Sequence, residues 1–274
     1  MARYNHPLLL AATTLLLAST GCEKVVDLDL KTSDSQLVIE GNLVDDNRPC
    51  QVRLSRSVNY AEANTFPPVT GATITLTDDA GGRETLRETS PGQYVGATLR
   101  GTPGRAYTLR VETGGAAYVA MSKLPVVVPF GGLRTEPGTF NADNIQAVVE
   151  YEDPAGAGNS YLFRQYRNGR LNKAFFIQND KFTDGKPVRQ ALRATGGGGS
   201  TADDLDKLAV GDSLVVEMQN IDPSVYEYYR TLNQILQSNP VFSTTPANPQ
   251  SNFSGGALGY FSAHSRRVRR LRIP

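Results

Sequence analysis

Short segments in which apolar and polar residues alternate recur between positions 35 and 124, spaced about ten residues apart. Tyr107, Leu109 and Val111 occupy every second position, so their side chains share one face of an extended strand. Glycine, proline, serine and aspartate fill the gaps between the segments, as in Ser90-Pro91-Gly92. The pattern predicts strands at 36–43, 50–57, 72–77, 84–88, 93–97, 106–112 and 117–122.

This arrangement of short strands and turns is typical of a small antiparallel β-sandwich. The order of glycines and tyrosines, as in Gly92-x-Tyr94 and Gly104-x-x-Tyr107, resembles the Ig-like or transthyretin-like modules of bacterial surface proteins. We therefore expect an Ig-like or transthyretin-like sandwich over residues 35–124. Because such modules are mostly spacers or docking domains, the resemblance predicts a fold and not an activity.

The second half of the chain continues the β pattern. Pro125 and Pro129 favour an extended linker over residues 125–129. Asn168-Gly169 and Asp184-Gly185 are hairpin signals. We expect a second β-rich domain over residues 130–274, with strands at 144–152, 160–168, 174–178, 188–194 and 213–220.

One segment has a helical period. In residues 223–237, Val225, Tyr229, Leu232 and Leu236 recur at i, i+4, i+7 and i+11, and Pro223 suits the first turn. An amphipathic helix packed on a sheet explains this stripe better than stacking of a ligand on its aromatic rings. The fold class expected for the whole chain is all-β (mainly β).

The N-terminus has the features of an export signal. The apolar run at residues 8–18 is shorter than the ~20 residues that a membrane-spanning helix needs. Small residues follow it and end at Cys22, the pattern of a bacterial lipoprotein signal. We predict a signal peptide over 1–21, lipidation of Cys22 and a tether over 22–34. The alternative is a plain secretory leader that ends near Gly21.

Charge and composition exclude several classes of site. The 28 basic and 27 acidic residues give a net charge of +1, which argues against a nucleic-acid partner. The two histidines are His6, in the leader, and His264. The mature chain therefore has no pair of histidines for a metal site, and we expect no metal and no cofactor. Cys50 is interpreted as a strand cysteine that behaves as a small apolar residue.

No motif for catalysis stands out, so we assign no catalytic residue. A serine–histidine–aspartate triad would depend on His264, next to Ser262 and Ser265, but the chain has no Gly-x-Ser-x-Gly motif. A carboxylate pair for hydrolysis stays open, because no spacing singles one out. The identity of a small-molecule ligand stays open as well.

Four further segments invite an interpretation. Residues 179–185 could begin an EF-hand calcium loop. Phe182 would take the third ligand position, however, and Ala191 the twelfth, where a glutamate is needed, so the segment predicts a polar turn. Residues 196–199 are four glycines, and they predict a mobile loop before an acidic patch. The glycines at 255, 256 and 259 predict a tight β turn. Residues 266–272 contain five arginines and predict a final or edge strand, or a surface for lipopolysaccharide head groups or an acidic partner.

Several motifs appear together in a fixed order along nearly the whole chain. They are the leader ending in Gly21-Cys22-Glu23-Lys24, Val38-x-Glu40-Gly41, Asp184-Gly185, Val210-Gly211-Asp212, the tyrosine-rich helix and Asn252-x-x-Gly255-Gly256-x-Leu258-Gly259-Tyr260-Phe261. The set resembles the domain of unknown function 4249 family, outer-membrane lipoproteins of Bacteroidota. The resemblance implies no defined activity. It implies a protein anchored in the outer membrane that faces the periplasm or the cell surface.

Members of that family are often encoded beside TonB-dependent outer-membrane receptors. The expected function is therefore a non-enzymatic binding or accessory lipoprotein that works beside a TonB-dependent transporter. The first alternative is a structural spacer or adhesion module at the cell surface. The second alternative is a hydrolase that uses carboxylates.

Overall fold

The computed structural model describes residues 34–59, 65–138, 141, 143–193, 207–237 and 248–274. Cys22, most of its tether and the glycine-rich loop at 196–199 lie outside the described residues. Ser35–Pro274 forms one compact unit. None of the helices described there is both long and apolar enough to cross a membrane.

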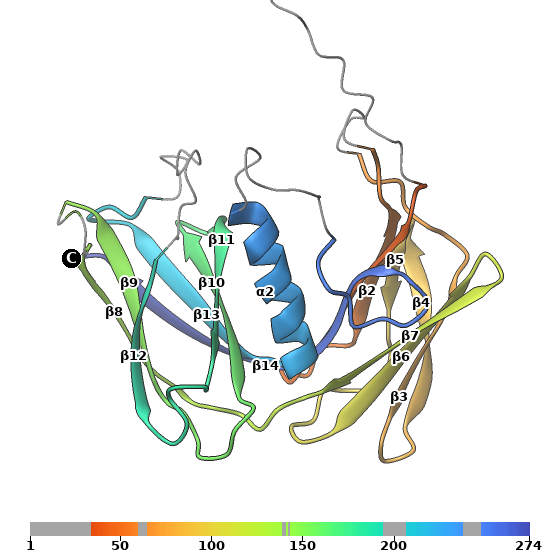
Figure 1. The fold of residues 1–274 in the computed structure, drawn as a ribbon, viewed down its shortest axis with the longest axis horizontal. Helices are drawn as coiled ribbons and strands as arrows, with labels where there is room; N and C mark the ends of the chain where they lie inside the picture. The colour runs from red at the N-terminus through yellow and green to blue at the C-terminus, as the bar shows by residue number, and fades with distance from the viewer. Residues whose placement is uncertain (1–33, 60–64, 139–140, 142, 194–206, 238–247) are drawn as a thin grey trace, which may run out of the picture. The chain divides into compact units, whose positions relative to one another are not determined.

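Strands dominate the described residues (Figure 1), so the prediction of an all-β fold is confirmed. An eleven-stranded sheet has the order β11-β10-β13-β14-β1-β2-β5-β4-β3-β6-β7, and a three-stranded sheet has the order β12-β9-β8. The strands are β1 Leu37–Val44, β2 Gln51–Arg56, β3 Thr73–Asp78, β4 Arg83–Ser90, β5 Gln93–Val95, β6 Ala106–Thr113, β7 Ala116–Lys123, β8 Phe130–Pro137, β9 Ile145–Glu152, β10 Ser160–Arg167, β11 Arg170–Asn179, β12 Pro187–Leu192, β13 Ser213–Asn220 and β14 Leu258–Arg272.

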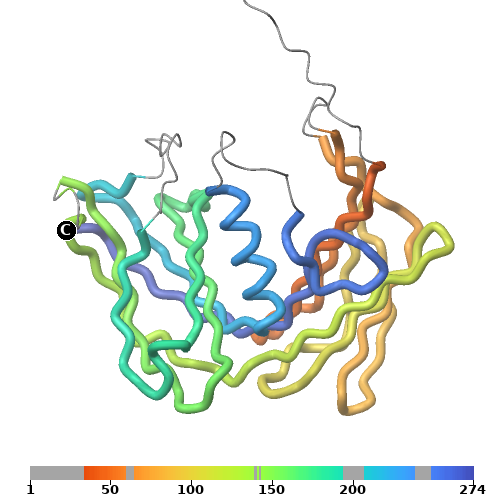
Figure 2. Tube along the Cα trace, viewed as in Figure 1, coloured from red at the N-terminus to blue at the C-terminus, as the bar shows by residue number. Residues whose placement is uncertain are grey.

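The long strand β14 joins the two halves of the chain in one sheet (Figure 2). Its first part pairs in parallel with β1, from Val38 opposite Leu258 to Val44 opposite His264. Its second part pairs antiparallel with β13, up to Ser213 opposite Arg272. The C-terminal strand therefore belongs to the sheet of both predicted domains.

Two hydrophobic cores lie on either side of this junction. The first is built from strands β1 to β7 together with Phe253, Ala257, Phe261 and Ala263. The second is built mainly from β9, β10, β13 and the end of the chain at Ile273. The predicted boundary at 125–129 stays a prediction. Residues 130–274 were predicted to form a second β-rich domain, and the prediction did not include the contribution of this range to the first core.

Tyrosine hydroxyls fix the chain at two bends of the first half. Tyr107 donates its hydroxyl to the carbonyl of Arg100 at 2.9 Å and accepts the amide of Thr102 at 2.8 Å. Tyr94 makes the same kind of bridge, between the carbonyl of Val69 and the amide of Ala72. Such corners are typical of Ig-like sandwiches and explain why tyrosines accompany the glycines in this segment.

The described helix, α2, spans Pro223–Gln237, where the sequence predicts it. Asp222 caps its start by accepting the amide of Ser224 at 2.9 Å. Val225 and Tyr229 are buried against Leu162 of β10 and Tyr260 of β14. The predicted apolar stripe is wrong at its last position, because Leu236 is 66% exposed.

The structure also tests the predictions made for the residues after 254. Gly255 and Gly256 form the predicted turn, with φ of 84° and 80°. Gly259 instead lies inside β14, where its backbone contacts Ile39 of β1. The arginine-rich segment is part of a final strand, as predicted, and it pairs with β13 on one side, beyond the end of the pairing with β1 at His264. Strand β8 was not predicted, because Gly131 and Gly132 interrupt its pattern.

Candidate functional site

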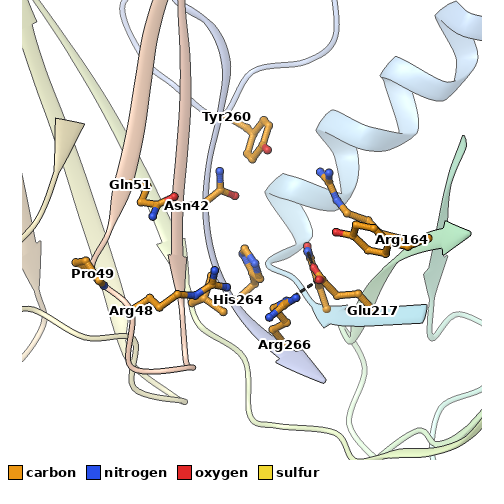
Figure 3. A pocket seen from close by; sticks show the side chains of 12 residues that line it. Asn42, Arg48, Pro49, Gln51, Arg164, Glu217, Tyr260, His264 and Arg266 are labelled. Atoms are coloured by element: carbon orange, nitrogen blue, oxygen red, sulfur yellow. Dashed lines mark hydrogen bonds and ion pairs between the residues drawn. The ribbon is translucent and has the colours of Figure 1, made fainter. Parts of the chain in front are cut away.

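A pocket of about 280 Å³ opens on the sheet face that carries α2 (Figure 3). Its walls come from β1, β2, β10, β13, β14 and the loop between β1 and β2. The lining residues are Asn42, Val44, Arg48, Pro49, Gln51, Arg164, Tyr166, Glu217, Gln219, Tyr260, His264 and Arg266.

The alternation of side chains in a strand places these polar groups on one face. On β14, Tyr260 and His264 face the pocket, whereas Phe261 and Ala263 between them belong to the first core. On β10, Arg164 faces the pocket and Phe163 belongs to the second core. The central strands therefore bury an apolar row on one side and present a polar row on the other.

Glu217 anchors a network at the floor of the pocket. It is 4% exposed, and it accepts hydrogen bonds from Arg266 Nε and Gln219 Nε2, each at 2.5 Å. Arg266 also lies 3.7 Å from the carboxylate of Asp46, which pairs with Arg48. Because the carboxylate of Glu217 is buried and must be neutralised, its pairing helps to hold Arg266 in place, whereas the Arg48–Asp46 pair lies nearer the solvent.

Arg164 lies on the opposite wall, near α2. Its Nη2 donates to the hydroxyl of Tyr229 at 2.9 Å. Its Nε is buried and has no hydrogen-bond partner among the described residues. No carboxylate of the described residues lies within ion-pairing distance of this guanidinium, although Glu217 lines the same pocket.

His264 is 3% exposed, and its Nδ1 lies 3.0 Å from the hydroxyl of Ser262. Burial, which disfavours the charged imidazolium, lowers the pKa of His264 to about 4. The ring is therefore neutral at neutral pH, and it contributes hydrogen-bonding groups to the pocket and no charge.

The pocket thus brings His264 and a carboxylate together, as a hydrolase would require. The geometry for a triad is incomplete, however. Ser262 is 2% exposed and is not part of the lining, and Ser265 donates its hydroxyl to Asn220 at 2.8 Å. Glu217 accepts its hydrogen bonds from Arg266 and Gln219 and is the one carboxylate among the described lining residues. A carboxylate pair therefore does not form there.

The remaining candidates from the sequence lie elsewhere. Cys50 is fully buried, and burial raises the pKa of its thiol, so it is an unreactive core residue. Asp180, in the polar turn, accepts the amides of Gly158 and Asn159. The described residues contain no group of three or more histidine, cysteine or acidic side chains arranged to hold a metal ion.

Sequence reasoning identified His264 and Arg266 as residues of interest but missed Arg164, Glu217 and Asn42. These three lie on strands far apart in the chain and meet only through the pairing of β1, β14, β13 and β10. The local signal was weak. A polar residue on every second position of a strand is the usual pattern of a solvated face.

The family described as Domain of unknown function (DUF4249) matches residues 23–270. This chain belongs to the DUF4249 family. The match confirms the family resemblance that the ordered motifs indicated. The lipid anchor and the outer-membrane location stay predictions for this family member.

Solved structures resemble the chain only distantly. Two fibronectin type-III domains of chicken tenascin show 12% identity and a TM-score of 0.25, covering 87% of this chain and 99% of that one. A DUF3823 family protein from Bacteroides uniformis shows 11% identity and a TM-score of 0.27, with coverages of 88% and 100%. A cytokine receptor complex shows 10% identity and a TM-score of 0.28, with coverages of 85% and 95%. A search of curated proteins found no match.

Proposed function

We propose that this DUF4249 protein is a non-enzymatic binding or accessory lipoprotein. A lipid on Cys22 holds it at the outer membrane, and it works there beside a TonB-dependent transporter. The observation that carries the binding role is the polar pocket beside α2, whose groups are already positioned by the sheet.

The chemistry of the pocket favours binding over catalysis. Its lining offers guanidinium, amide and phenol groups, which orient a ligand through hydrogen bonds. Ser262, which contacts His264, is 2% exposed and is not among the lining residues, and Glu217 is held by Arg266. A hydrolase would need an accessible nucleophile or a second carboxylate at this place.

The pocket also favours a binding role over that of a spacer. Glu217, Gln219 and His264 are each at least nine-tenths buried on the sheet face. Burying polar and charged groups costs free energy even when they are paired. A module that only separates two other parts gains nothing from such a cost, whereas a binding protein uses the preassembled groups.

The anchor and the partner are supported by the sequence. The short apolar run at 8–18 and the small residues before Cys22 support lipidation, and several acyl chains would hold the protein stably on a membrane. The transporter as partner comes from the family resemblance.

Two experiments test the proposal. Cys22→Ala should move the protein from the membrane fraction to the soluble fraction, and retention as firm as that of the wild type would contradict the anchor. A tagged wild-type chain should recover a TonB-dependent transporter from gently solubilised outer membranes. Recovery of none, where a known lipoprotein–transporter pair survives the same treatment, would contradict the partnership.

A further inference from the structure

We infer that the pocket beside α2 binds a small hydroxylated anion, whose carboxylate or phosphate group is recognised by the guanidinium of Arg164. This inference rests on the proposed binding function and names the ligand class of that site.

The charges that line the pocket do not balance. Arg266 is neutralised by Glu217, and Arg48 is neutralised by Asp46 at 2.5 Å. Arg164 has no carboxylate partner of this kind among the described residues, and His264 is neutral at neutral pH. The charge of Glu217 also attracts Arg164, but Glu217 is directly paired with Arg266. An anion that enters the pocket would give the half-buried guanidinium of Arg164 a direct partner.

The geometry of Arg164 suits an oxyanion. The hydroxyl of Tyr229 on α2 holds one nitrogen of the guanidinium, and Tyr229 is itself only 5% exposed. The side chain is therefore held in place before a ligand arrives. Its Nε is buried and has no acceptor among the described residues, so the ligand would meet the part of the guanidinium that lines the pocket. Carboxylates and phosphates match the planar donor fork of arginine.

The rest of the lining indicates hydroxyl groups on the same ligand. Asn42, Gln51 and Gln219 supply amides, and Tyr166 and Tyr260 supply phenols. These groups both donate and accept hydrogen bonds, as a polyol requires. The volume of about 280 Å³ lies just below the usual range for ligand pockets, so the ligand is small. A sugar acid or a sugar phosphate has this combination of properties.

Titration calorimetry on the mature chain tests this inference. Cys22→Ala keeps that chain in solution and alters none of the described residues. The probes are gluconate, glucose 6-phosphate, inorganic phosphate and neutral glucose. We expect gluconate or glucose 6-phosphate to bind more tightly than glucose and inorganic phosphate, and binding to weaken as salt is raised. The affinities for gluconate and for glucose 6-phosphate, compared with each other, show whether the site prefers a carboxylate or a phosphate.

Variants at two arginines connect the binding to the pocket. Arg164→Gln removes the charge and should weaken binding at least about tenfold, because charge-assisted hydrogen bonds are strong. Arg164→Lys keeps the charge and loses the fork, so it should bind with intermediate affinity. Arg272→Gln removes an exposed charge from the far end of β14, outside the pocket, and should leave the affinity unchanged.

The outcomes separate the ligand class from the proposed function. If glucose binds as tightly as gluconate and glucose 6-phosphate, or if Arg164→Gln binds as the wild type does, the anionic class is wrong while a binding role stands. If Arg164→Gln does not fold, the affinities of Arg164→Lys and Arg272→Gln are compared instead. Equal affinities of these two variants would contradict the anionic class in the same way. If none of the probes binds, the inference is wrong, and the transporter partnership is still judged by its own recovery experiment.

Discussion

His264 should make the protein sensitive to acid. Its pKa is about 4 in the folded chain, against an ordinary value of 6.5. Between these values the unfolded chain binds a proton that the folded chain does not, so stability rises with pH through this window and falls on acidification. From pH 7.5 to 4.5 the loss from this residue is about 2–3 kcal/mol in the free energy of unfolding.

His264→Gln keeps a hydrogen-bonding side chain beside Ser262 and removes the titration. Urea unfolding at several pH values should show that this variant loses about 2–3 kcal/mol less than the wild type over the same range. Parallel stability curves for the two proteins between pH 7.5 and 4.5 would contradict the burial of a neutral imidazole.

Gly259 is the one glycine of strand β14, and its backbone lies close to β1. Its φ is +93°, and a Cβ there would lie 2.0 Å from the carbonyl oxygen of Ile39 on β1. Gly259→Ala must therefore separate the two strands, and we expect it to lower the free energy of unfolding by more than about 3 kcal/mol.

Gly256 provides a matched control for this substitution. Its φ is +80°, but a Cβ there meets nothing within 4 Å. Gly256→Ala should cost only about 1 kcal/mol, the ordinary cost of an alanine at positive φ. Thermal melting of both variants measures the difference, and equal melting temperatures would show that β14 does not approach β1 so closely.

At the level of single residues, the sequence pointed to part of the site. His264 attracted attention as the one histidine of the mature chain, and its neighbour Ser262 does contact it. Arg164 gave no signal, because an arginine in a polar row of a strand is unremarkable. Its importance comes from the absence of a described carboxylate partner, which depends on contacts across strands.

At the level of elements, the helix α2 has one face packed on the sheet and another exposed to solvent, and substitutions on the two faces should differ in their effect on stability. Val225 is fully buried against the sheet, whereas Leu236 is 66% exposed. Val225→Ala should lower the free energy of unfolding by about 2 kcal/mol through the cavity that it leaves. Leu236→Ala should change it by less than about 0.5 kcal/mol, as measured by urea unfolding. Equal effects would mean that the helix presents a different face to the sheet.

Most of the elements could be predicted because their patterns are local. The period of two gave strands such as β6, and the period of 3.6 gave α2 at its observed bounds. Strand β14 was recognised only at its arginine-rich end, because the glycines at 255, 256 and 259 are typical of a turn. Its pairing with β1 joins residues more than two hundred positions apart, and no local pattern encodes such a contact.

At the level of the whole molecule, the shared strand couples the two halves of the sheet. The first core contains Phe253, Phe261 and Ala263 from the end of the chain. A fragment of residues 35–129 lacks these side chains and lacks β14, the strand that pairs with β1. We expect this fragment to show poor dispersion in a two-dimensional NMR spectrum and no cooperative melting, whereas the mature chain melts cooperatively.

Addition of a peptide covering residues 248–265 should restore dispersed signals in that fragment, because it supplies the missing strand. If the fragment alone melts cooperatively at the temperature of the mature chain, the first half is an independent domain. The predicted boundary at 125–129 would then describe the molecule better than a shared strand does.

The pocket beside α2 is proposed as a preassembled binding site for a small anion. A crystal structure of the mature chain soaked with the tighter-binding of gluconate and glucose 6-phosphate tests this claim most directly. We expect ligand density in the pocket, with the anionic group at the guanidinium of Arg164 and hydroxyls at the amides of Asn42 or Gln219. An empty pocket, with the ligand bound only at exposed arginines such as Arg272, would contradict it.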